Sequence, residues 1–214
     1  MTKREEKLRE RLAEMREIEN SLIKEGYHAI AGCDEVGRGP LCGPVVAACV
    51  VLPSDWDIPG LDDSKKLSEK RRNEMYDVIV QNAVAYDVGI VDNNRIDEIN
   101  ILNATKEAMR DAIAGVRKKT DIDYLLIDAL KLDVGVPCSG IVKGDAKSIS
   151  IAAASIVAKV TRDAMMVQYA KEYPGYGWER NKGYGTKEHY EGIEKNGITP
   201  IHRRSFLKKE IARK

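Results

Sequence analysis

Apolar residues recur at helical spacing in several separate stretches of the chain. The first stretch, residues 3–24, carries apolar side chains three or four positions apart among charges: Leu8, Leu12, Met15, Ile18 and Leu22. This spacing predicts one amphipathic helix. Similar patterns predict helices at 95–118 and 148–171. Two further helices are predicted, one that Ser68 caps and a short one that starts at Thr186.

Shorter apolar runs, several of them rich in β-branched residues, predict buried strands between these helices. The runs lie at residues 27–33, 45–52, 83–91 and 122–127, and a last strand begins at residue 141. Three strands come first, and strands then alternate with helices. This order predicts an α/β protein with a mixed central sheet covered by helices on both faces.

Length and composition set the class of protein. The chain has 214 residues, of which 43% are hydrophobic and 32% charged, so we expect one soluble globular domain. No apolar run approaches the roughly 20 residues that a membrane span needs, and the charged start lacks the apolar stretch of a signal peptide. We therefore expect a cytoplasmic protein without membrane attachment, in which the four cysteines are free thiols: Cys33, Cys42, Cys49 and Cys138.

The net charge of +1 conceals an uneven distribution. Residues 25–170 carry 17 basic and 22 acidic side chains, whereas residues 171–214 carry 11 basic and 6 acidic ones. An acidic body beside a basic segment suits a metal site next to a polyanion. A solvated basic tail explains the same charges, and on charge alone this second interpretation is favoured. If the first interpretation holds, Arg203 and Arg204 are expected to lie along a phosphate backbone.

Acidic residues stand at the ends of three predicted strands. Asp34 and Glu35 follow one apolar run, Asp128 ends a second and Asp145 follows a third. Unpaired charges at the ends of buried strands are costly, and carboxylates that converge repel each other unless a cation neutralises them. Hard oxygen ligands favour Mg²⁺ or Mn²⁺. Each acid alone is better explained as a helix cap or an ion-pair partner, but four together favour a metal site.

A glycine-rich loop follows the first acidic pair. The spacing of Gly37, Gly39 and Gly43 faintly resembles a dinucleotide-binding turn, but Pro40 and Pro44 intervene and a β-like run follows where that turn requires a helix. A loop that exposes main-chain amides to a ligand explains the glycines better. A plain tight turn remains the alternative.

Seven segments, in this order, resemble the motifs of the ribonuclease HII family: AGCDEVGRGPLCGPVVAA, DDSKKLS, NILNATKEAM, IDAL, KGDAKSISIAAASIVAKVTRD, YPGYGWERNKGYGTKEH and GITPIHRRSF. The resemblance runs from about residue 29 to residue 206. It implies a ribonuclease H-like fold with a small C-terminal helical and loop part. The chain then divides into an N-terminal helix, residues 1–26, and a catalytic domain, residues 27–214, that includes the basic segment.

The resemblance also implies an activity. A family member hydrolyses the RNA strand of RNA–DNA hybrids and nicks duplex DNA 5′ of embedded ribonucleotides, with Mn²⁺ or Mg²⁺ as cofactor. Two-metal-ion hydrolysis leaves a 3′-hydroxyl and a 5′-phosphate. The expected partners are therefore these two nucleic acids, bound by a monomer.

Site residues follow from the resemblance position by position. The catalytic and metal-binding acids are Asp34, Glu35, Asp128 and Asp145. The loop that senses the ribose 2′-hydroxyl is Gly37, Arg38 and Gly39, and Tyr184 packs on the sugar at the RNA–DNA junction.

Other polar and aromatic residues keep two interpretations each. Asp163 is a rival for the fourth acid, although an ion pair on the helix surface explains it better. For the remaining candidates, the functional interpretation is contact with phosphate, proton transfer or stacking on bases, and the structural one is a solvated or packed side chain. These residues are Lys65, Lys159, Lys182, Lys187, Ser64, Ser155, His189, His202, Tyr173, Tyr176 and Trp178.

Two other functions compete with the ribonuclease. One is a ribonuclease H-fold nuclease or transposase-like enzyme that acts on DNA, which the Gly-Arg-Gly loop and the distant Lys-Gly-Tyr segment disfavour. The other is a non-catalytic module that binds nucleic acid, which four retained acids disfavour because they repel phosphate without metals.

Overall fold

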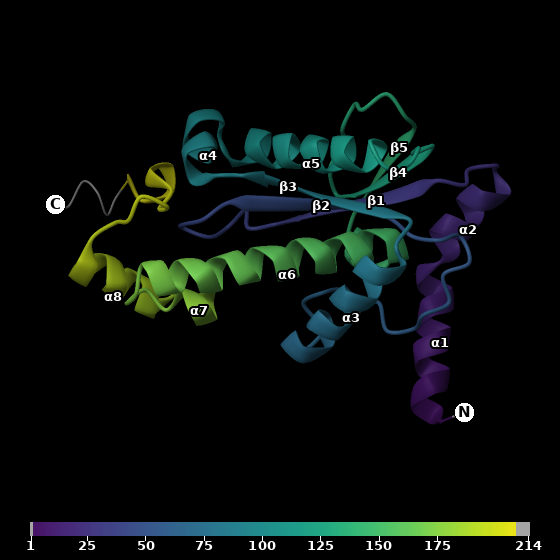
Figure 1. Cartoon of the computed structure of the whole chain (residues 1–214), viewed down its shortest axis with the longest axis horizontal. Coiled ribbons are helices and arrows are strands. Elements are labelled where there is room, and N and C mark those ends of the chain that lie inside the picture. The colour runs from purple at the N-terminus through teal and green to yellow at the C-terminus, as the bar shows by residue number, and fades with distance from the viewer. Residues whose placement is uncertain (1, 209–214) are drawn as a thin grey trace.

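The computed structural model describes residues 2–208, and a five-stranded sheet lies at its centre (Figure 1). The strands are β1 (Ile30–Val36), β2 (Val45–Val51), β3 (Ala85–Val91), β4 (Tyr124–Asp128) and β5 (Cys138–Ile141), in the order β3-β2-β1-β4-β5. β2 is antiparallel to both β1 and β3, whereas β4 is parallel to both β1 and β5. The predicted mixed sheet is therefore confirmed.

Helices cover both faces of this sheet. α4 (Asn93–Ile99) and α5 (Ile101–Arg117) lie on one face, and α3 (Glu69–Asn82) and α6 (Ile149–Glu172) lie on the other (Figure 1). Each face has its own apolar core, one built around α5 and the other around α6. The N-terminal helices α1 (Lys3–Met15) and α2 (Glu17–Lys24) pack beside the start of α6.

α6 approaches β1 closely. A Cβ on Gly32 of β1 would lie 2.0 Å from the Ser150 carbonyl carbon, so only glycine fits there. On the helix, Ala152, Ala153 and Ala154 are fully buried. Small side chains on both elements thus bring α6 directly under the strand that carries Asp34.

Several element boundaries differ from those predicted. The helix expected over 3–24 is interrupted at Arg16, and the one expected over 95–118 is interrupted at Asn100. Asn100 adopts φ 66°, and its side chain accepts hydrogen bonds from the first amides of α5. The last predicted strand lies earlier, at Cys138–Ile141, so Asp145 sits in a separate 3₁₀ turn, η1 (Gly144–Ala146).

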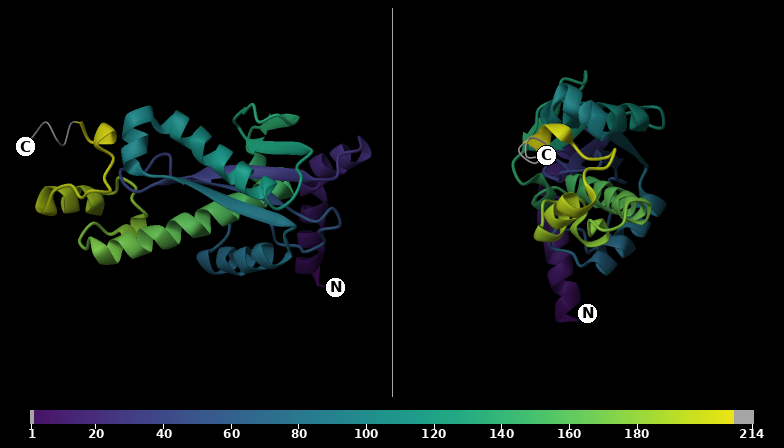
Figure 2. Two further views of the ribbon diagram at one scale, coloured as in Figure 1. Left: turned by 45° about the horizontal axis from the view of Figure 1, so that its top comes forward. Right: turned by 90° about the vertical axis from the view of Figure 1, so that its left-hand side faces the viewer.

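The C-terminal part forms a small third core at one end of the sheet. It contains α7 (Trp178–Asn181), α8 (Lys187–Asn196) and η2 (Arg204–Phe206), which face the viewer in the end-on view of Figure 2. Trp178 and Tyr176 stack at 4.7 Å between ring centroids and are buried, so they pack this part together. The basic residues from 209 onwards lie outside the described residues.

Two further expectations concern thiols and membranes. All four cysteines are free, and burial raises the pKa of Cys42 and Cys49 to about 12. Within residues 2–208, none of the helices combines the length and apolar character that crossing a membrane requires.

Candidate active site

The first pair of acids lies inside β1, close to its end. Alternation along the strand directs Ala31 and Cys33 into the α5 core, so Asp34 faces α6 instead. The Asp34 carboxylate accepts hydrogen bonds from the Ser155 hydroxyl of α6 and from the Glu35 amide, the latter at 2.7 Å. Ser155 has one hydroxyl proton, so its 2.9 Å contact with the Ser64 hydroxyl makes Ser64 the donor there. This chain of hydroxyls holds Asp34 in a site where it is only 5% exposed.

The other two acids come from the adjacent parallel strand and the turn after β5. Asp128 ends β4, next to β1, and its Oδ1 accepts a 2.7 Å hydrogen bond from the Gly144 amide. This bond ties the η1 turn to the end of β4. Lys143, with φ 57°, directs the chain into the turn that carries Asp145. The Lys65 ammonium lies 3.4 Å from the Asp145 carboxylate.

Burial and mutual repulsion act on these carboxylates together. Burial is the main cause that raises the pKa of Asp34 well above its usual range, and the Glu35 and Asp128 charges add to it. Burial also raises the pKa of Glu35, although the nearby Arg38 opposes this. For Asp145, burial and the Asp63 charge raise the pKa against the effect of Lys65. The protein therefore gathers negative charge where water cannot solvate it.

The acids converge, but they do not form a closed metal-ligand cluster. Among residues 2–208, no three His, Cys, Asp or Glu side chains are arranged so that they could hold a metal ion. A divalent cation nevertheless fits the chemistry of the site. The donors are hard carboxylate oxygens, and the buried Oε2 of Glu35 has no hydrogen-bond partner among residues 2–208. An orphaned buried carboxylate oxygen is costly unless a positive charge approaches it.

Two buried arginines hold the glycine-rich loop between β1 and β2. Arg203 is fully buried, and its guanidinium donates to the carbonyls of Gly37, Arg38, Pro40 and Gly43 over 2.6–3.0 Å. Arg162 of α6, also fully buried, donates to the carbonyls of Cys42, Pro44 and Lys182 over 2.9–3.1 Å. A Cβ on Gly37, where φ is 93°, would lie 2.2 Å from the Arg162 Nε. The loop thus turns its carbonyls towards the two guanidiniums.

The expectation that Arg203 lies along a phosphate backbone is therefore wrong. Its charge is inside the protein, where burial and the neighbouring Arg162 lower the pKa of Arg203 to about 9. At neutral pH the guanidinium is still charged. Arg204, the next residue, is exposed. No local pattern in the chain separates these two arginines. Arg162 could have been noticed, because it falls four residues after Ala158 and four before Met166 on the buried face of α6.

Tyr184 lies against the same loop. A Cβ on Gly39 would be 3.5 Å from the Tyr184 ring, and the Leu41 amide donates to the Gly183 carbonyl at 2.8 Å. The ring remains 44% exposed. The structure therefore brings Tyr184 next to Gly39, although 144 residues separate them in the chain.

His189 and His202 form a hydrogen-bonded pair that contacts the backbone of Tyr184. Thr199 donates its amide proton to the Nδ1 of His202, which leaves a proton on Nε2 to donate to His189 at 3.1 Å. The Nδ1 of His189 then donates to the Tyr184 carbonyl at 2.9 Å. Both rings are almost fully buried beside Trp178, and burial lowers the pKa of His202 to about 4. They pack and position the loop rather than shuttle protons.

Of the remaining candidates, Asp163 and the lysines have partners that show what each side chain contacts. Asp163 pairs with Lys159 one helical turn earlier at 2.8 Å, so the predicted ion pair is confirmed. The Lys65 ammonium contacts Asp145, and the Lys182 ammonium donates to the Glu179 carbonyl. Lys187 is exposed and forms an ion pair with Glu191.

Comparisons with known proteins agree on one family. The family model described as ribonuclease HII matches residues 31–209. A ribonuclease HII of Enterococcus faecalis (strain ATCC 700802 / V583) is 58% identical over 193 residues, which are 90% of this chain and 75% of that protein. The crystal structure of ribonuclease H2 from Pyrococcus horikoshii OT3 is similar with a TM-score of 0.72 at 28% identity, over 86% of this chain and 97% of that one.

A more distant structure shares the fold. Bst-RNase HIII, solved in complex with Mn²⁺, has a TM-score of 0.65 at 19% identity, over 87% of this chain and 70% of that one. The predicted ribonuclease H-like fold is confirmed by these neighbours.

Proposed function

The chain belongs to the ribonuclease HII family and is therefore a metal-dependent enzyme that hydrolyses phosphodiester bonds in RNA–DNA hybrids; from this premise we propose that it also nicks duplex DNA 5′ of single embedded ribonucleotides. The products are a 3′-hydroxyl and a 5′-phosphate. The enzyme acts as a monomer, with residues 27–214 as its catalytic domain.

The approach of Tyr184 to Gly39, beside the acids of β1, is the observation that carries this proposal. A single ribonucleotide differs from its neighbours by one hydroxyl, and acids alone cannot select its phosphate because every phosphate of the duplex is alike. Recognition of the 2′-hydroxyl needs a donor or acceptor aimed at it. The amides of Gly37, Arg38 and Gly39 can supply it, because the carbonyls of Gly37 and Arg38 are bound by Arg203 on the other side of the loop.

The exposed ring of Tyr184 supplies the second part of the recognition. A flat ring on a deoxyribose leaves no room for a 2′-hydroxyl on that sugar. The hydrogen bond from His189 to the Tyr184 carbonyl holds the backbone that carries this ring next to Gly39. The loop and the ring together therefore select a ribose followed by a deoxyribose, which is the junction in a DNA strand with one ribonucleotide.

Asp34, Glu35, Asp128 and Asp145 are the residues that would hold divalent cations. When bound, two Mn²⁺ or Mg²⁺ ions supply an activated water and stabilise the charge of the leaving oxygen. The chain itself contributes the fixed positions of the carboxylates: Ser155 orients Asp34, and the Gly144 amide orients Asp128. Lys65, at 3.4 Å from Asp145, adds a cation at the rim that can contact a phosphate.

Cleavage of a defined duplex tests the proposal. A DNA duplex with one ribonucleotide is labelled at the 5′ end and incubated with enzyme, with and without Mn²⁺. A single product that ends at the deoxynucleotide before the ribonucleotide, and that carries a 3′-hydroxyl a polymerase can extend, is the expected result. Asp34→Asn serves as the inactive control.

Other outcomes separate the competing functions. Cutting of an all-DNA duplex at similar rates would indicate a nuclease of transposase type. Binding of the hybrid without cleavage in Mn²⁺ would indicate a binding module. Cleavage of long hybrids but not of the single ribonucleotide would remove junction recognition from the proposal and leave the family activity.

A further inference from the structure

The two N-terminal helices precede the part of the chain that the family model matches, residues 31–209. They are nevertheless attached to the catalytic loops. The first turns of α1 project from the body (Figure 1), whereas Leu12 and Met15 at its end are buried in the core beneath α6. Three polar side chains of this segment, Arg11, Arg16 and Glu19, are directed into the protein.

Arg11 connects the two loops that meet at Asp145. Its Nη2 donates to the Ala146 carbonyl at 2.7 Å, directly after Asp145, and to the Asp62 carboxylate at 3.0 Å. Asp62 lies in the same loop as Lys65, between β2 and α3, and the Lys65 ammonium lies 3.4 Å from the Asp145 carboxylate. One guanidinium therefore holds both the turn that bears the acid and the loop that bears its cationic partner.

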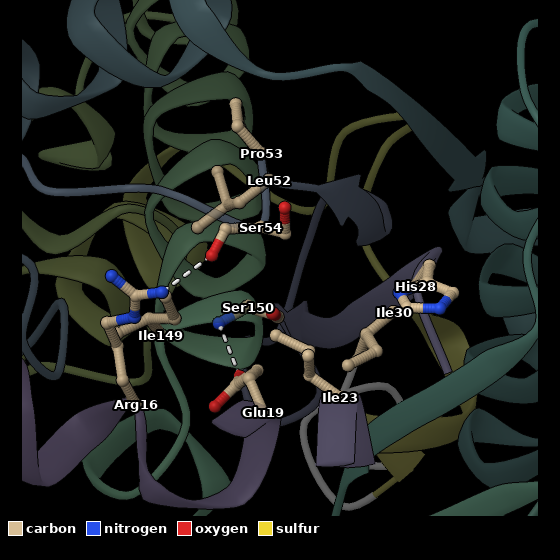
Figure 3. A pocket seen from close by; sticks show the side chains of 10 residues that line it. All are labelled: Arg16, Glu19, Ile23, His28, Ile30, Leu52, Pro53, Ser54, Ile149 and Ser150. Atoms are coloured by element: carbon tan, nitrogen blue, oxygen red, sulfur yellow. Dashed lines mark hydrogen bonds between the residues drawn. The ribbon is translucent and has the colours of Figure 1, made fainter. Parts of the chain in front are cut away.

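Glu19 holds the chain that follows this turn. Its Oε1 accepts hydrogen bonds from the Ser148 hydroxyl at 2.5 Å and from the Ser150 amide at 3.1 Å, at the start of α6. Figure 3 shows Glu19 directed at Ser150, with Arg16 beside it donating to the Ser54 carbonyl at 2.6 Å. Glu19 is only 6% exposed. Glutamate is almost never buried in a protein core unless it is paired. A negative charge at a helix N-terminus is stabilised there.

We propose that Arg11 and Glu19 are positioning residues for Asp145, which makes the N-terminal helices part of the catalytic centre. The inference rests on the proposed function, because it concerns how that site holds its cations. Asp145 lies in a three-residue turn that no strand pairs with. Arg11 fixes this turn one residue after the acid, and Glu19 fixes the chain three and five residues after it.

The consequence of losing either contact differs from ordinary destabilisation. The Asp145 carboxylate would move relative to Asp34 and Asp128, which are held by other elements. Removal of a group that orients a metal ligand typically weakens metal affinity or activity 10–100-fold. Most contacts to a duplex are expected away from this position, so the KM for substrate should change little while kcat and the affinity for Mn²⁺ fall.

Arg11→Gln, compared with Arg9→Gln, is the first test. Arg9 lies on the same helix, and its pair with Asp57 is exposed, with 52% of the Arg9 side chain accessible. Mn²⁺ affinity is measured by calorimetry without substrate, and kcat and KM are measured on a duplex with one ribonucleotide. Arg11→Gln is expected to bind Mn²⁺ about tenfold more weakly and to lose kcat about tenfold, with KM within twofold, whereas Arg9→Gln matches the wild type.

Glu19 provides an independent test through its conservative variant. The amide oxygen of Glu19→Gln can still accept from Ser148 and Ser150, so this variant should retain Mn²⁺ affinity, whereas Glu19→Ala should lose it about tenfold. If Glu19→Ala does not fold, the comparison of Arg11→Gln with Arg9→Gln decides alone.

The result that overturns the inference is an Arg11→Gln enzyme with the Mn²⁺ affinity and kcat of Arg9→Gln. A fall in melting temperature without a change in Mn²⁺ affinity would also overturn it, because a merely structural contact behaves in this way. Failure of the proposed function looks different: the wild type would not cleave the duplex, or Asp145→Asn would leave Mn²⁺ binding unchanged.

Discussion

Replacing Arg203 by lysine tests the most unexpected contact of the site. The guanidinium donates four hydrogen bonds from three nitrogens to carbonyls of the loop after β1. The donors of a lysine side chain share one nitrogen, so we expect it to reach at most two of these carbonyls. At least two buried carbonyls then lose their partner at about 1–3 kcal/mol each, and for two carbonyls the free energy of unfolding falls by about 2–6 kcal/mol.

Thermal denaturation and cleavage together measure the effect. For a chain of this size about 1 kcal/mol lowers the melting temperature by about 2–4 °C, so Arg203→Lys should melt about 4–24 °C lower. At a temperature where the variant is folded, cleavage at a single ribonucleotide should fall more than cleavage of a long hybrid, because the loop amides lose their orientation.

The exposed neighbour Arg204 supplies the matched control. Arg204→Gln should change the free energy of unfolding by no more than about 0.5 kcal/mol. The affinity of each variant for the nucleic-acid duplex is then measured at several salt concentrations. Each lost phosphate contact reduces the slope of log affinity against log salt concentration by about 1. Arg203→Lys should leave the slope unchanged. A wild-type melting temperature for Arg203→Lys, or a reduced slope for an Arg203→Gln variant that melts normally, would refute the reasoning and return Arg203 to the phosphate backbone.

Three further predictions concern the acids and the ring. Asp34→Asn should abolish nearly all cleavage and yet raise the melting temperature without metal, because it removes a buried, repelled charge; scanning calorimetry and a cleavage assay check both effects. Asp145→Asn should lower the cleavage rate by orders of magnitude, whereas Asp163→Asn should keep the rate and cost at most about 1 kcal/mol in denaturant unfolding; the reverse would make Asp163 the fourth acid. Tyr184→Ala should lose more rate on a single ribonucleotide than on a long hybrid, with Tyr184→Phe intermediate, and equal losses on both substrates would contradict junction recognition.

The sequence predicted the elements because their signals are local. Apolar periodicity located the helices, and β-branched runs located the strands of the mixed sheet. Breaks inside helices were missed because they depend on single residues: Asn100 adopts a positive φ that its residue type permits but does not require. The family motifs predicted a site at the four acids, and the parallel pairing of β1 with β4 places Asp34 and Asp128 side by side.

The contacts that hold the site could not be predicted, since each joins segments far apart in the chain. Arg11 and Ala146 are 135 positions apart, and Arg203 and Gly37 are 166 apart. Asp145 was expected at a strand end, but its strand stops at Ile141 and a left-handed Lys143 turns the chain before the acid. Local patterns carry no information on which distant carbonyl a guanidinium will reach.

The buried arginines also show why charge counts along a chain mislead about its surface. A loop that offers amides to a ligand must direct many of its carbonyls inward, and here no neighbouring strand pairs with them. Buried carbonyls need donors, and a guanidinium supplies up to five in one plane. Arg203 counts towards the +5 of residues 171–214, and Arg162 offsets acids in the body, yet both charges serve backbone carbonyls. The exposed charge of the C-terminal part is therefore smaller than its composition suggests, because the Arg203 guanidinium is buried against the loop after β1.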